Sequence, residues 1–158
     1  MAVSFTLNGL AQSVDVDPAT PLIYVLRNEL LLHGAKLGCG LEQCGACVVL
    51  ADGAPIYACT TPLSDIAGAS LETVEGLADE HGRLHPLQQA FIEVNAMQCG
   101  YCSAGMLMRL KALLDEHANP SREAVIEALD GHLCRCGAHP RVLHAVERAV
   151  AIRTVGHQ

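Results

Sequence analysis

The segment Gly38-Cys39-Gly40-Leu41-Glu42-Gln43-Cys44-Gly45-Ala46-Cys47 brings three cysteines and three glycines together within ten residues. A fourth cysteine, Cys59, follows it, so the first set has the spacing C-x4-C-x2-C-x11-C. Glycine adopts positive φ without the steric cost of a Cβ atom, and it lets backbone N–H groups approach a bound anion closely. This segment therefore predicts a tight loop whose amide groups surround a negatively charged centre.

The spacing of these four cysteines is typical of a plant-type [2Fe-2S] cluster, which four cysteine thiolates hold. A structural zinc site with ordinary turn glycines is the alternative, but zinc ligands usually come as two closely spaced pairs. We therefore expect one cluster at the first set, which consists of Cys39, Cys44, Cys47 and Cys59.

A second set of four cysteines combines C-x2-C with C-x-C across thirty-one intervening residues: Cys99, Cys102, Cys134 and Cys136. Both pairs precede predicted helices, whose exposed amides and dipoles stabilise thiolates. On spacing alone, this set also fits a structural zinc site or a C-x-x-C redox pair. The redox pair is the weaker of these two, because no βαβ pattern surrounds it.

Composition limits the partners that this chain can have. Its 158 residues support one ordinary domain or two small ones, and 51% hydrophobic residues indicate a folded chain. A formal net charge of −7 disfavours nucleic acid and anionic membranes, and 3% aromatic residues leave few rings for base stacking.

The sequence predicts neither a signal peptide nor a membrane span. The first basic residue is Arg27, and the longest uncharged stretch, Val94–Met108, is shorter than the roughly 20 apolar residues that a spanning helix needs. We expect a cytoplasmic location, with any association with the inner membrane made through partners. Thiols stay reduced there, which favours metal binding over disulfides.

The first half is predicted to consist of strands and turns around one helix. A strand over Val3–Leu7, an Asn8-Gly9 turn and a strand over Gln12–Val16 make a hairpin. Thr20-Pro21 is expected to begin a helix that Gly34 ends. After the cysteine loop, the sequence predicts short strands over 48–50 and 56–58 that the turn Asp52-Gly53 joins.

The second half has helical periodicity. Pro86 opens one predicted helix, Ser103–Leu114 forms another, and segments around 124–129 and 140–150 form the third and fourth, which together can pack as a bundle. A polar, glycine-punctuated stretch near 76–84 separates the halves. We therefore expect two domains, 1–76 and 77–158, with a linker at about 76–84.

Both cysteine sets, with their flanking residues, resemble the small iron–sulfur subunits of the molybdenum hydroxylases, the xanthine oxidase and aldehyde oxidoreductase superfamily. The resemblance covers nearly the whole chain and rests on residues 38–47, Gln98-Cys99-Gly100-Tyr101-Cys102 and Leu133-Cys134-Arg135-Cys136-Gly137. With His85–Phe91, the chain looks most like the small subunits of bacterial nicotinate dehydrogenase and isoquinoline 1-oxidoreductase. It departs from the usual family pattern at Gly137-Ala138-His139-Pro140, where ligation stays intact.

The resemblance implies an α+β fold, with an N-terminal β-grasp plant-type ferredoxin-like domain followed by a C-terminal four-helix bundle iron–sulfur domain. The first cysteine set would hold an outer [2Fe-2S] cluster and the second set an inner one. The inner cluster would face the molybdenum–pterin cofactor of a large catalytic subunit. In the family, the residues that match Gln98 and Cys136 touch the pterin.

The implied function is that of a non-catalytic electron-transfer subunit in an oxidoreductase complex. It would relay electrons from the molybdenum cofactor to a cytochrome c or FAD-containing subunit during hydroxylation of an N-heteroaromatic compound such as nicotinate. The alternatives are a subunit of an aldehyde- or purine-oxidising enzyme, a free-standing two-cluster ferredoxin, and a zinc module for protein binding. The chain has no dinucleotide, P-loop or H-E-x-x-H motif, and its eight histidines show no ligand spacing.

Overall fold

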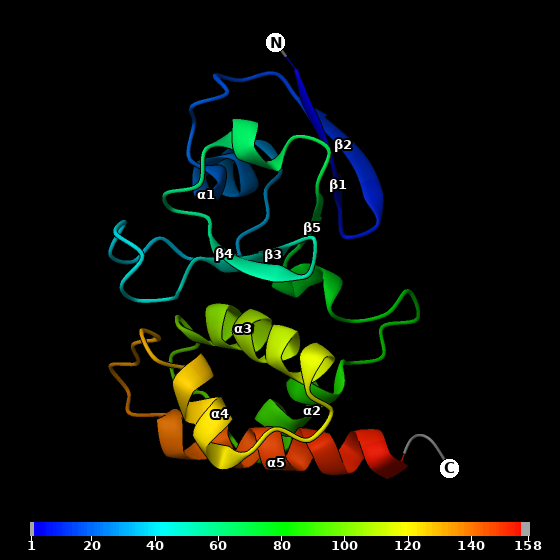
Figure 1. Ribbon diagram of the computed structural model, residues 1–158, viewed down its shortest axis with the longest axis vertical. Coiled ribbons are helices and arrows are strands. Elements are labelled where there is room, and N and C mark those ends of the chain that lie inside the picture. The colour runs from blue at the N-terminus through cyan, green and yellow to red at the C-terminus, as the bar shows by residue number, and fades with distance from the viewer. Residues whose placement is uncertain (1, 156–158) are drawn as a thin grey trace.

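The strands form one mixed sheet, and the longer helices lie together on one side of it (Figure 1). The computed structural model describes residues 2–155. The strand order is β2-β1-β5-β3-β4, and the strands are β1 Val3–Leu7, β2 Leu10–Val14, β3 Val48–Ala51, β4 Ala54–Tyr57 and β5 Ser70–Glu72. The chain is therefore an α+β protein.

The β1–β2 hairpin follows from its turn residues. Asn8 and Gly9 both have positive φ, 48° and 83°, which is the geometry of the tight two-residue hairpin turn. Pairing resumes immediately, with Leu7 opposite Leu10. The predicted second strand, Gln12–Val16, therefore lay too far along the chain, because the turn occupies only two residues.

The first helix is shorter than predicted. α1, Leu22–Tyr24, continues as a single π-helical turn over Val25–Glu29, and Pro21 rather than Thr20 is its N-cap. Leu31 has a φ of 55°, which ends the helix before Gly34. Arg27 then holds the departing chain through hydrogen bonds to two main-chain carbonyls.

The central strand β5 was not predicted. It has three residues, and it pairs in parallel with β1 and antiparallel with β3. Short 3-10 turns flank it on both sides, at Leu63–Ile66 and Val74–Gly76.

The helices of the second half are confirmed with somewhat different ends: α2 Pro86–Glu93, α3 Ser103–Glu116, α4 Arg122–Ala128 and α5 His139–Val155. Ser121 caps α4, because its Oγ accepts a hydrogen bond from the Ala124 amide. Among residues 2–155, no helix is both long and apolar enough to cross a membrane.

Strand β3 belongs to both hydrophobic cores. Val48 and Leu50 pack with the helices α2 to α5, whereas Cys47 and Val49 pack with the core around α1. Side chains of a strand alternate between its two faces, so one strand can close both cores. Lys111 of α3 adds an ion pair of 3.1 Å to Glu72 of β5. The sheet and the helices are thus packed directly on each other beside the cysteine loops.

Candidate metal centres

The loop of the first cysteine set turns its amides toward sulfur. The amides of Leu41 and Gln43 donate hydrogen bonds of 3.3 and 3.2 Å to Cys39 Sγ, and the Cys39 amide donates one of 3.4 Å to Cys44 Sγ. Such contacts stabilise negative charge on cluster-ligating sulfur. The geometry fits the expectation of an amide-lined, thiolate-held centre.

Two positions of this loop require glycine, because atoms of other side chains lie too close to them to leave room for a Cβ atom. A Cβ atom on Gly38 would lie 2.6 Å from Cys44 Sγ. Gly45 has a φ of 70°, and a Cβ atom there would overlap the ring of His132. The small residues therefore let the loop fold tightly over its own thiols and against the second half of the chain.

Burial and hydrogen bonding affect these thiols differently. Desolvation acts to raise the pKa of Cys39, but the hydrogen bonds from Leu41 and Gln43 outweigh it and lower that pKa to about 7. Burial raises the pKa of Cys47 to about 12, and it raises the pKa of Cys102 to about 12 as well. A metal ion deprotonates a coordinating thiol, so bound metal would keep Cys47 and Cys102 ionised.

The second cysteine set lies in two turns that precede helices. Cys102 is the N-cap of α3, and Cys134 accepts a hydrogen bond of 3.4 Å from the Ala138 amide, just before α5. The loops that contain the two sets project on the same side of the molecule, at the left in Figure 1. Cys99 is exposed, whereas Cys102, Cys134 and Cys136 are half-buried.

The strongest interactions among the eight thiols fall in four pairs: Cys39 with Cys44, Cys47 with Cys59, Cys99 with Cys136, and Cys102 with Cys134. Within the part of the chain that the structure describes, no three His, Cys, Asp or Glu side chains converge on a single metal ion. In a [2Fe-2S] cluster each iron takes two protein ligands. The two-plus-two arrangement in each set fits such a binuclear centre.

The two loops touch each other directly. The Leu133 amide donates a hydrogen bond of 3.1 Å to the Cys44 carbonyl, and the Tyr101 hydroxyl donates one of 2.7 Å to the Leu37 carbonyl. Between the loops lies a cavity of about 310 Å³, which is lined by Gly38, Cys44, Ala46, Cys99, Tyr101, Cys102, Leu133, Cys134 and Arg135. Thiols of both sets therefore line one shared cavity.

Gln98 lies beside the second set. Its Nε2 donates a hydrogen bond of 3.1 Å to the Cys136 carbonyl, and the side chain is exposed. The structure thus brings together the two residues expected at the pterin, whose contact with that group stays a prediction. His132 was expected only as a surface or packing residue. It lies buried where the loops meet. In the sequence, only its position directly before Leu133-Cys134 indicated that it lies near the second cysteine set.

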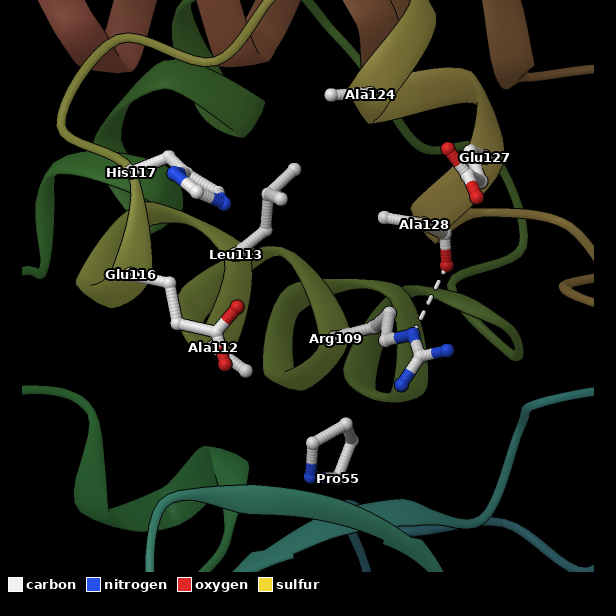
Figure 2. A pocket seen from close by; sticks show the side chains of 9 residues that line it. All are labelled: Pro55, Arg109, Ala112, Leu113, Glu116, His117, Ala124, Glu127 and Ala128. Carbon is white, nitrogen blue, oxygen red and sulfur yellow. Dashed lines mark hydrogen bonds between the residues drawn. The ribbon is translucent and has the colours of Figure 1, made fainter.

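A second cavity, of about 410 Å³, contains no cysteine (Figure 2). It lies between α3, α4 and β4, and Arg109 Nε crosses one side of it to reach the Ala128 carbonyl at 3.0 Å. This hydrogen bond ties the end of α4 to α3. The cavity is therefore a feature of helix packing that is separate from the thiol sets.

Comparisons with known proteins agree with this chemistry. Residues 5–78 match the family described as 2Fe-2S iron-sulfur cluster binding domain, and residues 73–147 match the [2Fe-2S] binding domain family. The chain is 48% identical to a nicotinate dehydrogenase subunit of Pseudomonas putida, with 96% of each chain covered. It is 45% identical to the alpha subunit of isoquinoline 1-oxidoreductase from Brevundimonas diminuta, with 93% of this chain and 96% of the relative covered.

Solved structures extend the comparison to the fold. A chain of quinoline 2-oxidoreductase from Pseudomonas putida 86 has a TM-score of 0.90 at 41% identity, with 96% of this chain and 93% of that chain covered. Aldehyde oxidoreductase from Desulfovibrio gigas has a TM-score of 0.92 at 38% identity, and this chain matches 18% of its length. Since two [2Fe-2S] family descriptions match its two halves, and relatives that are small subunits of such enzymes match nearly its full length, this chain belongs to the family of small iron–sulfur subunits of the molybdenum hydroxylases.

Proposed function

We propose that this chain relays electrons from the molybdenum cofactor of a large catalytic subunit to an external acceptor while an N-heteroaromatic compound such as nicotinate is hydroxylated. The observation that carries this proposal is the direct contact of the two cysteine loops through the Leu133–Cys44 hydrogen bond. The names of the relatives, which include nicotinate dehydrogenase and isoquinoline 1-oxidoreductase subunits, favour this substrate class over aldehydes and purines.

The cluster ligands in this proposal are the two cysteine sets. The outer site consists of Cys39, Cys44, Cys47 and Cys59, and the inner site of Cys99, Cys102, Cys134 and Cys136. When bound, the two [2Fe-2S] clusters supply one-electron carriers. The sulfur pairs support a finer assignment, in which each pair of contacting thiols holds one iron.

We assign the outer site to a β-grasp ferredoxin-like domain, residues 1–76, and the inner site to a four-helix bundle domain, residues 77–158, with a linker near 76–84. The presence of two hydrophobic cores, one around α1 and one among α2 to α5, supports this division, and strand β3 contributes side chains to both. The two family matches, which meet at residues 73–78, support it as well.

The exposed end of the inner site is the proposed face for the large subunit. Cys99 and Gln98 are exposed there, next to Cys136, so a pterin could approach without rearrangement of the chain. In this assignment, the Gln98 amide holds the Cys136 carbonyl and also hydrogen-bonds to the cofactor. A cytochrome c or an FAD-containing subunit would accept electrons at the outer site.

We also propose a cytoplasmic location for the complex. The eight cysteines are free thiols, and a reducing compartment keeps such thiols available for metal. Fractionation of the native host, with a blot for this chain against periplasmic and membrane markers, would test this location.

The function is tested by purifying the native complex and identifying its other chains. We expect a large molybdenum-binding partner, about four irons and four acid-labile sulfides per copy of this chain, and bleaching of the clusters by nicotinate or a related heteroaromatic. Bleaching by aldehydes or xanthine alone would overturn the substrate class. A colourless zinc protein would overturn the cluster assignment, and a stable four-iron chain without any partner would indicate a free-standing ferredoxin.

A further inference from the structure

We propose that His132 is a positioning residue for electron transfer between the two cluster sites, because its buried ring fills the space over Gly45 and holds the first cysteine loop on the second. This inference rests on the proposed two-cluster function. It concerns a side chain that is outside both ligand sets.

The environment of His132 is unusual for a histidine. Its side chain is 2% exposed, and neither ring nitrogen has a hydrogen-bond partner within residues 2–155. The main chain of Asp130 lies close enough to interact electrostatically with the ring, but not in hydrogen-bond geometry. Buried polar atoms normally find partners, so shape rather than hydrogen bonding must account for the fit of this ring.

The ring lies against the outer-site loop. A Cβ atom on Gly45 would lie only 2.5 to 2.8 Å from three atoms of the His132 ring. Gly105 of α3 also lies so close to the Gly45 carbonyl that a Cβ atom there would collide with it. Gly45, which lies between two expected ligands of the outer site, is therefore in close contact with both the ring and the helix.

The backbone of His132 is fixed at several points. Its amide donates to the Leu129 carbonyl at 2.9 Å, and His139 Nε2 donates to its carbonyl at 2.7 Å. Arg109 holds the preceding helix through the Ala128 carbonyl, as Figure 2 shows. The backbone that carries the ring is thus tied to α3, α4 and the start of α5.

These contacts place His132 where it controls the separation of the two sites. Its neighbour Leu133 donates the hydrogen bond to Cys44, and the next residue is Cys134. Removing the ring would open a gap over Gly45, loosen the Leu133–Cys44 contact and admit water beside the outer site.

The test uses the assembled complex, reduced with dithionite, and compares wild type with His132→Ala and with the exposed control His144→Ala. Iron and sulfide contents report ligation. EPR reports the magnetic splitting between the two reduced clusters and the midpoint potential of the outer one, which depends on solvent exposure. We expect His132→Ala to keep full iron but to lose splitting and to shift the outer potential, whereas His144→Ala matches wild type.

Unchanged splitting and potential in His132→Ala would overturn the inference. If that variant does not assemble, His132→Leu gives the answer, because leucine has nearly the same volume and no nitrogen. Wild-type splitting in His132→Leu would support the steric role, and weakened splitting would contradict it. Absence of both cluster signals from the wild-type complex would instead defeat the proposed function itself.

Discussion

The main-chain amide of Leu133 lies 3.1 Å from the carbonyl oxygen of Cys44 and donates a hydrogen bond to it. Cys44 is itself an expected ligand of the outer site, and Leu133 precedes Cys134, an expected ligand of the inner site. This hydrogen bond therefore links a ligand of one site to the neighbour of a ligand of the other, although the residues that form it are far apart in the sequence. Because the bond is made by backbone atoms, side-chain substitutions leave its donor and acceptor in place.

Replacing one ligand in each set should remove one cluster at a time. We expect Cys44→Ser and Cys102→Ser each to lose about half of the iron and one EPR signal, since each of the four thiol pairs lies within one set. Iron analysis and EPR of the reduced protein measure this. Loss of both signals from a variant that stays folded would show that the sites do not assemble independently.

Gly105→Ala should separate α3 from the outer-site loop. Its Cβ atom would collide with the backbone carbonyl of Gly45, which cannot rotate away as a side chain can. We expect a loss of about 1–3 kcal/mol in the free energy of unfolding, together with loss of outer-site iron. Denaturant unfolding with iron analysis measures both.

The control for this variant is Gly53→Ala, whose Cβ atom would meet nothing within 4 Å. Its φ of 80° is strained for alanine, so it should cost about 1 kcal/mol and leave the iron content unchanged. Equal iron loss in both variants would contradict the packing argument.

The features that could be predicted from the sequence are those that depend on a residue and its near neighbours in the chain. Asn8-Gly9 and Asp52-Gly53 specified tight hairpins, and Pro86 marked the first position of α2, because these residues act through their own backbone preferences. The cysteine spacing indicated which thiols belong to each set. Strand β5 escaped prediction because three residues carry no periodicity, and their parallel pairing with β1 is a long-range contact.

The sequence indicated which cysteines belong to each candidate site, but it did not indicate how those cysteines are arranged in space. Spacing does not reveal that Cys99 interacts most strongly with Cys136, and Cys102 with Cys134, since that pairing depends on how α3 and α5 pack. The burial of His132 against Gly45 depends on the same packing. Both features are tertiary, and the sequence offers no local pattern for either.

His85 should make the stability of the chain depend on pH. Its Nδ1 accepts a hydrogen bond from the Leu87 amide at the start of α2, so the ring must be neutral to cap the helix. Burial, followed by the charge of Lys111, lowers the pKa of His85 in the folded state. Its contribution is therefore complete above the unfolded value of about 6.5 and is lost as the pH falls below that value toward the folded pKa.

The variant His85→Ser keeps a capping hydroxyl without a titrating group. We expect its melting temperature to fall less than that of wild type between pH 7 and pH 5. Parallel melting curves for the two proteins across this range would show that His85 does not titrate on unfolding.

The chain without its large partner should associate with itself. Leu133 and Tyr101 are 64% and 49% exposed next to the inner site, and Met97 is 38% exposed. Exposed apolar groups of this kind mark interfaces. We expect Leu133→Ser to make the isolated chain more monodisperse in size-exclusion chromatography and to weaken its assembly with the partner. The exposed Ile126 on α4 provides the control, and an equal effect of Ile126→Ser would argue against a local interface.

Gln98→Ala distinguishes an internal role of this amide from a role at the cofactor. The Gln98 side chain is exposed and donates one hydrogen bond to the Cys136 carbonyl, whose loss alone costs about 0.5–1.5 kcal/mol. If Gln98 also pairs with the pterin, the variant leaves a polar group of the assembled interface unpaired, at a cost of about 1–3 kcal/mol. That cost corresponds to about a ten- to hundredfold loss in molybdenum retention or in substrate-driven cluster reduction. The isolated chain should keep its iron.

Gln89→Ala, which removes an exposed amide bonded to Glu93, is the matched control, and it should have the molybdenum content and the reduction rate of wild type. Wild-type molybdenum content and reduction rate in Gln98→Ala would remove Gln98 from the cofactor interface, and loss of inner-site iron from the isolated chain would assign the amide to the internal contact instead.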